Sequence, residues 1–114
     1  MSGFIMIDVR GRRIESLTLG RLQIDAPRWL ATWDGVKVKL PRAPMLLVYH
    51  LACRPGLIRS RDALFAAIVT KATANPNRTI DSCVKRARRA FEEVDPNFNQ
   101  IDAVYTIGYR WRLE

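Results

Sequence analysis

The stretch from Arg78 to Val94 carries apolar and charged residues with the period of an α-helix. Apolar side chains recur there at the i, i+3, i+4 and i+7 spacing that places them on one side of a helix. They are Ile80, Cys83, Val84, Ala87, Ala90, Phe91 and Val94. The opposite side carries Arg78, Ser82, Lys85 and Arg89, with Asp81, Arg86 and Arg88 on its flanks. The stretch therefore predicts a helix over 78–94 that packs on a core and presents a row of cations.

Residues at both ends of this stretch favour helix termini. Asn77 is expected as the N-cap, because its side chain can accept a hydrogen bond from an N–H of the first turn. The helix is expected to end before Pro96, because proline disfavours helical geometry in the preceding residue.

The charged side of this helix has few acids to neutralise it. Five cations between Arg78 and Arg89 share one acid, Asp81, and further acids follow only after Phe91. A solvated surface is the plain alternative. However, the 114 residues include 19 basic and 11 acidic side chains, a formal charge of +8. This excess suits a nucleic acid backbone or an anionic membrane surface, and the charge pattern of the helix favours nucleic acid.

The composition indicates one globular domain, with 48% hydrophobic and 26% charged residues. Cys53 and Cys83 form no C-x-x-C pair, and a single histidine completes no zinc-ligand set, so no metal and no cofactor are expected. The apolar run from Met45 to Ala52 is too short to span a bilayer, and the N-terminus lacks a signal-peptide layout. A cytoplasmic protein with reduced thiols is expected.

The first 40 residues predict an antiparallel sheet with one apolar face. Residues 1–16 are expected to be an N-terminal arm or extra strand, with Phe4–Val9 extended, ahead of a domain over 17–114. Strands are expected around 17–19, 22–25, 29–33 and 36–40, with a hairpin turn at Asp34-Gly35. Trp29 and Trp33 are expected to pack in the core, since they precede the basic region.

Three helices and a hairpin are expected after the sheet, which gives an α+β fold. A short buried helix is expected to begin at Pro44. Ser60 is expected to cap a second helix, after a short strand at Leu57–Ile58. The polar segment Thr70–Asn77 predicts an exposed loop before the basic helix. Residues 101–113 predict a hairpin that turns at 106–108 and alternates apolar residues with arginines.

This order, with a basic helix followed by a basic and aromatic hairpin, is typical of a winged helix-turn-helix. The major groove of B-DNA admits one helix, whose outward side chains reach base edges. We therefore expect the helix over 78–94 to enter the major groove and the hairpin over 101–113 to be the wing. The protein is then a sequence-specific DNA-binding transcriptional regulator.

Twelve residues are candidate DNA contacts. Arg78, Lys85 and Arg86 are expected at base edges or nearby phosphates, with Ser82 and Thr79 beside them. Residues expected to position phosphates are Arg61, Arg88, Arg89, Tyr109 and Arg110, and the wing candidates are Tyr105 and Thr106. A core role remains open for Tyr109 and is favoured for Trp111. Cys83 borders the apolar side, so packing is favoured over a redox switch.

The same residues resemble a family. Arg78-Thr79-Ile80-Asp81, Lys85-Arg86 and Gly108-Tyr109-Arg110-Trp111 are similar to the effector domain of OmpR/PhoB-type response regulators. So are Arg54-Pro55-Gly56 and Ser60-Arg61-Asp62-Ala63-Leu64. Within that family, RTIDS and DPNFNQIDAVY are most similar to the ChvI-like regulators of alphaproteobacteria. The resemblance covers about 17–113 and implies a four-stranded sheet, three helices, a hairpin and promoter binding by two protomers on direct repeats.

The sequence departs from the family pattern at three places. No receiver domain precedes the effector residues, so either an orphan regulator or an excised domain is expected. Pro41 to Met45 replace the usual Thr-x-x-Glu-Phe at the first helix. In the wing, Thr106 replaces a glycine and Tyr105 stands where arginine is frequent, while Cys83 replaces the usual histidine of the recognition helix. Sequence preference is therefore expected to differ more than the fold.

Two other functions compete with DNA recognition. Catalysis is not expected, because His50 is the only histidine and no nucleophile, phosphate-loop or metal motif is present. A protein-interaction module, which acts on another regulator or on RNA polymerase and binds DNA weakly, is the stronger rival. Membrane attachment ranks third, because Phe91 is the only aromatic residue of the basic helix.

Regulation is expected to act through amount or partners, because no phosphoryl transfer can occur within this chain. A monomer in solution is expected, pairing head to tail on DNA. The opposing charges would be Glu92, Glu93 and Asp95 on one side and Arg12, Arg13 and Arg28 on the other. The resemblance implies that loop 70–77 contacts RNA polymerase.

Overall fold

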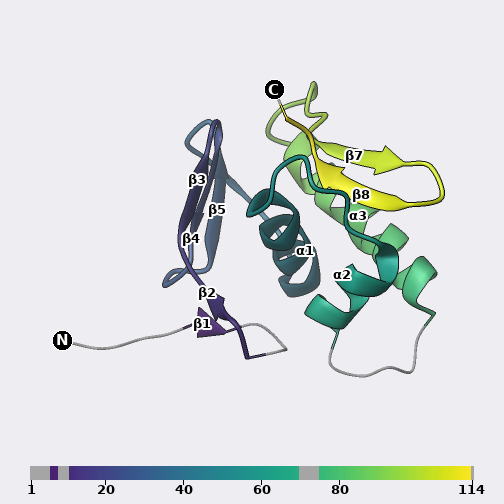
Figure 1. The fold of residues 1–114 in the computed structure, drawn as a ribbon. Coiled ribbons are helices and arrows are strands. Elements are labelled where there is room, and N and C mark those ends of the chain that lie inside the picture. The colour runs from purple at the N-terminus through teal and green to yellow at the C-terminus, as the bar shows by residue number, and fades with distance from the viewer. Residues whose placement is uncertain (1–5, 8–10, 70–74, 114) are drawn as a thin grey trace.

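The computed structural model describes residues 6–7, 11–69 and 75–113. Within these ranges six short strands come first, three helices follow, and two strands form a C-terminal hairpin (Figure 1). Figure 1 shows the first helix, α1, between the N-terminal sheet and the other helices, with the hairpin beside the third helix, α3. This order confirms the predicted α+β arrangement of sheet, three helices and wing.

The four-stranded sheet is antiparallel, with its strands in chain order. They are β3 (Leu17–Leu19), β4 (Leu22–Asp25), β5 (Leu30–Trp33) and β6 (Val36–Val38). Along β4, Leu22 and Ile24 are buried while Gln23 is exposed, which is the alternation of a sheet with one apolar face. Asp34 and Gly35 have φ of 55° and 80°, as a tight hairpin turn requires, so the predicted turn is confirmed.

A second, two-stranded sheet precedes these strands. β1 (Met6–Ile7) pairs antiparallel with β2 (Arg13–Ile14). Part of the Phe4–Val9 prediction lies outside the described residues, and the division at residue 16 stays a prediction. Ile14 belongs to the common core, and the N–H of Glu15 donates to the Tyr49 hydroxyl at 3.2 Å. These contacts hold β2 against α1.

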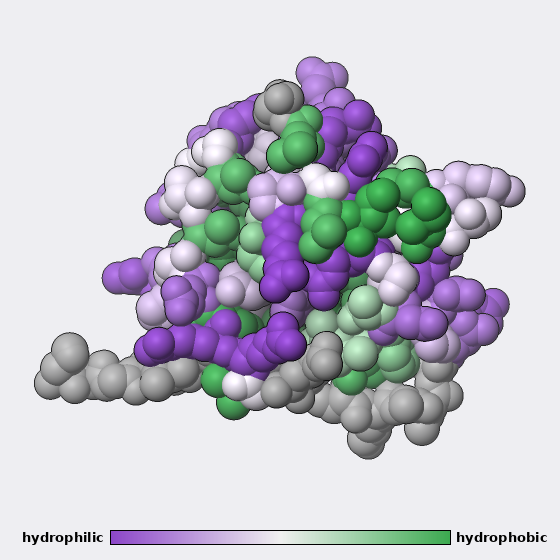
Figure 2. Space-filling view, in the orientation of Figure 1, coloured by the Kyte–Doolittle hydropathy of each residue, from purple (hydrophilic) through white to green (hydrophobic). Residues whose placement is uncertain are grey.

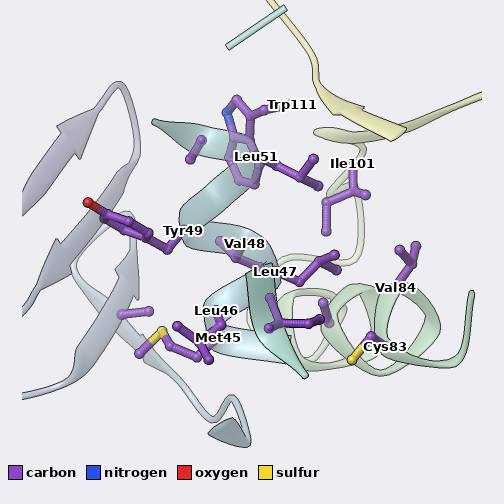
Figure 3. Close-up of a cluster of buried hydrophobic side chains, with 14 of the residues drawn as sticks. Met45, Leu46, Leu47, Val48, Tyr49, Leu51, Cys83, Val84, Ile101 and Trp111 are labelled. Atoms are coloured by element: carbon purple, nitrogen blue, oxygen red, sulfur yellow. The ribbon is translucent and has the colours of Figure 1, made fainter. Parts of the chain in front are cut away.

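Helix α1 (Arg42–Ala52) is the most buried element of the fold. It begins two residues before Pro44, so the predicted start was wrong. Pro44 is tolerated as the third residue because the first-turn N–H groups have no acceptor within the helix. Every residue from Pro44 to Ala52 is buried. Figure 3 shows Tyr49 pointing toward the sheet and Leu47 lying on the side nearer Val84 of α3, so α1 joins the two halves of the core.

Helix α2 (Arg61–Ile68) begins at the predicted cap, because Ser60 Oγ accepts a hydrogen bond from the Ala63 N–H at 3.1 Å. The strand predicted at Leu57–Ile58 is absent from these residues. Instead Arg59 forms an isolated β-bridge with Tyr109. Each backbone N–H donates to the other residue's carbonyl oxygen, with N···O distances of 2.8 and 3.0 Å. Gly108 permits this approach, because a Cβ there would lie 2.0 Å from the Arg59 carbonyl oxygen.

Helix α3 (Pro76–Glu92) starts earlier than predicted. Asn75 is the N-cap, and its Oδ1 accepts from the N–H groups of Asn77 at 3.0 Å and Arg78 at 3.3 Å. The predicted Asn77 cap was therefore wrong, because Pro76 at the first helical position extends the helix. The buried residues are those of the predicted apolar side from Ile80 to Phe91: Ile80, Cys83, Val84, Ala87, Ala90 and Phe91.

The C-terminal hairpin consists of β7 (Ile101–Val104) and β8 (Gly108–Trp111), joined by a turn at 105–107, one residue before the predicted position. Its residue Trp111 is buried, as predicted. An aromatic cluster fixes the hairpin to the helices and the sheet. Phe91 and Phe98 stack at 4.3 Å, and Trp33 and Trp111 pack edge-on to Phe91 at 5.7 and 6.2 Å. The packing role predicted for Trp33 is confirmed.

Candidate nucleic-acid interface

The outer side of α3 is a cationic surface supported by a buried apolar side. Its cap at Asn75 and the burial of Ile80, Val84 and Phe91 fix the rotation of the helix about its axis. Five of the candidate DNA contacts on α3 are exposed, namely Arg78, Ser82, Lys85, Arg86 and Arg89, and Thr79 is half-buried. Within the described residues, none of the four cations forms an ion pair. We call these five exposed residues the α3 face.

Arg88 differs from the α3 face. It is half-buried, and its Nη2 donates to the carbonyl oxygen of Ile101 at 2.8 Å. The contact joins the last turns of α3 to the first residue of β7. The structure therefore ties Arg88 to the hairpin, where the sequence suggested a phosphate contact alone.

A cluster of three side chains joins α2, α3 and β8. Asp81 Oδ1 accepts hydrogen bonds from the Tyr109 hydroxyl at 2.6 Å and from Arg61 Nε at 2.7 Å. The Arg61 guanidinium carbon also lies 5.2 Å from the centre of the Tyr109 ring, a cation–π distance. Asp81, Arg61 and Tyr109 are called the Asp81 cluster below. Because its members come from three elements, the cluster fixes the orientation of α3 relative to the wing.

The ionisation of the Asp81 cluster follows from these contacts. Partial burial raises the pKa of Asp81, but the hydrogen bonds from Tyr109 and Arg61 outweigh it and hold the pKa below its ordinary value. Burial, followed by the hydrogen bond to Asp81, raises the pKa of Tyr109. The cluster is therefore a carboxylate, a neutral phenol and a guanidinium at neutral pH. Arg61 and Tyr109, both candidate DNA contacts, thus have protein partners in this cluster, and Tyr109 is only 6% exposed.

In the wing, the charged side chains lie along the strands β7 and β8 and just after β8, and apolar side chains lie at the tip. Arg110 Nε and Arg112 Nη2 both contact Asp102, at 3.0 and 3.2 Å. At the turn, Tyr105 is 90% exposed and Ile107 is 55% exposed. Thr106 between them has φ of 61°, a left-handed conformation that is rare for a β-branched residue. The wing tip is therefore apolar and strained, and its cations lie nearer the body of the domain.

Sequence reasoning missed the partners of several of these residues. The bridge at Arg59 joins positions far apart in the chain, whereas Asp102 pairs with Arg110 and Arg112 within one hairpin. Asp95, which the sequence placed on a pairing surface, has a side chain that is 15% exposed. It accepts hydrogen bonds from Trp33 Nε1 at 3.0 Å and Arg21 Nη2 at 2.9 Å. For Asp102 a signal existed, because the alternation of the predicted hairpin places it on the same face as Arg110 and Arg112.

The described residues contain no group of three or more histidine, cysteine, aspartate or glutamate side chains placed to hold a metal ion. In the same part of the chain, no helix is both long enough and apolar enough to cross a membrane.

Comparison with known proteins identifies a family of transcription regulators. Residues 35–111 match the family described as "Transcriptional regulatory protein, C terminal". The chain belongs to this family. The matched residues include α1 to α3 and the wing. The family is a class of transcription regulators and not of enzymes.

Two curated transcription-control proteins are similar to this chain over most of its length. The transcriptional regulatory protein BaeR of Escherichia coli O6:H1 is 37% identical over 93 residues, 82% of this chain and 39% of BaeR. The aerobic respiration control protein ArcA of Escherichia coli K12 is 30% identical over 101 residues, 88% of this chain and 42% of ArcA. The chain thus spans about two fifths of the length of these relatives.

Solved structures of the family share the fold. The DNA-binding domain of the response regulator AdeR, in complex with an intercistronic region, matches 86% of this chain and all of that domain, with a TM-score of 0.78 and 20% identity. The Klebsiella pneumoniae RstA DNA-binding domain, in complex with the RstA box, matches 86% of this chain and 97% of that domain, with a TM-score of 0.71 and 26% identity. These similarities confirm the winged-helix fold.

Proposed function

We propose that this chain is a sequence-specific DNA-binding transcriptional regulator that places α3 in the major groove of promoter DNA. The α3 face carries the proposal, because its four cations form no ion pair within the described residues and lie with a hydroxyl on a helix whose other side is fixed in the core. A helix of this kind fits the major groove, and arginine can donate two hydrogen bonds to guanine. The AdeR and RstA domains, which were solved with DNA, support this assignment.

The candidate residues take three roles in this proposal. Arg78, Lys85 and Arg86 read base edges or adjacent phosphates, with Ser82 and Thr79 as hydroxyl partners. Arg89 and Arg110 position phosphates. Three further candidates are proposed to act indirectly. By holding α2, α3 and the hairpin together, they keep the phosphate-contacting residues in position; they are Arg61, Arg88 and Tyr109. Tyr105 and Thr106 lie at the wing tip and contact the sugar-phosphate backbone or the minor groove.

A second function is favoured by the wing tip. Tyr105 and Ile107 form an exposed apolar end without a cation, which suits a protein surface better than a phosphate. The chain would then be an interaction module for another regulator or for RNA polymerase, with weak, sequence-indifferent DNA binding. A mobility shift on an operator found by genome-wide pull-down, compared with a scrambled duplex, separates the two functions. DNA recognition predicts strong preference for the operator, and the rival predicts none.

The assembly on DNA is also proposed. Two protomers lie head to tail on direct repeats, with Glu92 and Glu93 of one protomer facing basic residues near the sheet of the next, Arg12, Arg13 and Arg28. This heterologous contact requires direct repeats and not inverted ones. Exposed ion pairs contribute about 0–1 kcal/mol each, so the chain is a monomer in solution.

Cellular context completes the proposal. The chain acts in the bacterial cytoplasm, and its segment 70–77, of which residues 70–74 lie outside the described ranges, contacts RNA polymerase. The RTIDS and DPNFNQIDAVY segments support closest kinship with ChvI-like regulators.

A further inference from the structure

A cavity of about 160 Å³ lies among β2, α1, the α1–α2 connection and α2. Four of its lining residues are arginines, Arg12, Arg13, Arg54 and Arg59, and His50 lies beside them. Among the described residues, no acidic side chain and no residue of the α3 face lines it. Figure 2 shows strongly hydrophilic side chains on this face of the molecule, in front of α1 and along the β1–β2 hairpin. The cavity is therefore a second cationic feature, separate from the proposed DNA contacts of α3.

Three of the four arginines at the cavity form no ion pair within the described residues. None of the ion pairs there involves Arg13, Arg54 or Arg59. By contrast, Arg21 and Arg28 on the sheet each contact a carboxylate. Guanidinium groups that converge from separate segments repel one another, so an anion between them is electrostatically favoured.

Arg59 is held in place at this cavity. Its Nη1 donates to the carbonyl oxygen of His50 at 3.3 Å, and its backbone is bridged to Tyr109 in β8. Guanidinium has five N–H groups in a planar fork, so this contact leaves donors for a second acceptor. The matching acceptor is a planar or tetrahedral oxyanion, which takes two such hydrogen bonds together.

The size of the cavity limits the ligand. One water occupies about 30 Å³ in the liquid, so the space corresponds to roughly five waters. We propose that this cavity binds an oxyanion of the phosphate class, with Arg13, Arg54 and Arg59 as its donors. The phosphate comes either from a free ion or small phosphate ester, or from the backbone of bound DNA. The site goes beyond the proposed function, since binding of a free ion requires no DNA.

Nuclear magnetic resonance of the 114-residue chain tests the site directly. The chain is titrated with sodium phosphate, and with sodium chloride at equal ionic strength. We expect saturable changes in the amide signals of Arg54 and Arg59, and at Tyr109 because it is bridged to Arg59. Arg54→Ala is expected to weaken phosphate binding about tenfold, the loss of one charge-assisted hydrogen bond. Arg42→Ala, which removes an exposed cation outside the cavity, is the matched control and is expected to change nothing.

A second arm identifies the source of the phosphate. The slope of log K against log salt is measured on a duplex of random sequence for the wild type and for Arg54→Ala. If free phosphate gives no saturable change but the slope falls by about 0.9, the backbone of DNA supplies the anion. An unchanged slope together with no saturable response to phosphate would overturn the site. If the wild type binds free phosphate, equal phosphate affinities of Arg54→Ala and Arg42→Ala would also overturn it. Because the first arm contains no DNA, its result does not depend on whether α3 reads an operator.

Discussion

At the scale of single residues, the α3 face and the wing tip show opposite situations. Arg86 is exposed on a helix whose other side is buried, so its side chain is free to meet a ligand without loss of packing. Thr106 instead holds a backbone conformation that its side chain disfavours. Substitutions at the two positions therefore separate an effect on recognition from an effect on stability.

Replacing Arg86 with alanine is expected to relax base preference at one or two operator positions. A bidentate arginine–guanine contact contributes roughly 1–3 kcal/mol of discrimination, and the stability of the fold should not change. Affinities for a single half-site and for its point variants check this. Lys37→Ala, which removes an exposed cation from β6, is the control. Equal discrimination by the two variants would remove Arg86 from the base-reading residues.

Replacing Thr106 with glycine is expected to stabilise the protein by about 1 kcal/mol. A left-handed non-glycine residue costs of order 1–3 kcal/mol, and the extra freedom of glycine in the unfolded chain offsets part of this. Urea unfolding measures the change. Ala103→Gly in β7, where no such strain exists, should instead destabilise the hairpin by about 0.5–1 kcal/mol. Destabilisation by both substitutions would show that Thr106 is not strained.

At the scale of elements, periodicity predicted most of the fold and contacts across the chain decided the rest. The apolar side of α3 could be read from the sequence because a helix repeats its spacing locally. The start of α3 was predicted too late in the chain, because both Asn75 and Asn77 can cap a helix and the Asn75-Pro76 pair was not recognised as its start. The Asp81 cluster could not be predicted, because it depends on how Arg61 and Tyr109 approach α3 in space.

Removal of the Tyr109 hydroxyl in Tyr109→Phe tests the Asp81 cluster. We expect a loss of about 1.5 kcal/mol in the free energy of unfolding, because a hydrogen bond to a carboxylate is broken. We also expect DNA affinity to fall a few-fold, as α3 and β8 lose a common contact. Tyr105→Phe makes the same chemical change on a side chain that is 90% exposed, and its stability should match the wild type. Equal stability of the two variants would mean that the cluster does not fasten the elements.

At the scale of the whole molecule, one ion-pair network joins the sheet to the end of α3. Arg21 contacts Asp34 and Asp95, and Asp95 also accepts from the Trp33 indole N–H. The indole N–H, the N–H of Asn97 and Arg21 hold the pKa of Asp95 below its ordinary value of 3.8. The pKa of Asp34 is lowered by its hydrogen bonds from Arg21. As the pH falls toward 3.8, the folded state therefore binds fewer protons than the unfolded state.

The consequence is a stability that falls in acid. The contribution of Asp95 should be complete above about pH 5 and should decline as the pH falls through 3.8 toward the lowered folded value. Asp95→Asn is expected to flatten this decline in urea unfolding measured from pH 6 to pH 3. Glu92→Gln changes an exposed carboxyl at the end of α3 and serves as the control. An unaltered pH dependence in Asp95→Asn would contradict the role of this network.

The assembly state also belongs to the whole molecule. The proposed contacts between protomers are exposed ion pairs, so sedimentation without DNA should show a monomer. Binding should be tighter to two direct half-sites than to one, and no tighter to inverted half-sites. A stable dimer without DNA, or equal affinity for inverted repeats, would count against head-to-tail pairing.

The most direct test of the central claim is protection of guanine N7 from methylation, because N7 lies in the major groove. The wild-type chain, bound to its operator without a phosphoryl donor, is compared with Arg86→Ala and Lys37→Ala at equal occupancy. We predict protection at specific guanines by the wild type and by Lys37→Ala, with loss of protection at one position in Arg86→Ala. Absence of N7 protection on a saturated operator, or the same protection in all three proteins, would contradict the placement of the α3 face in the major groove.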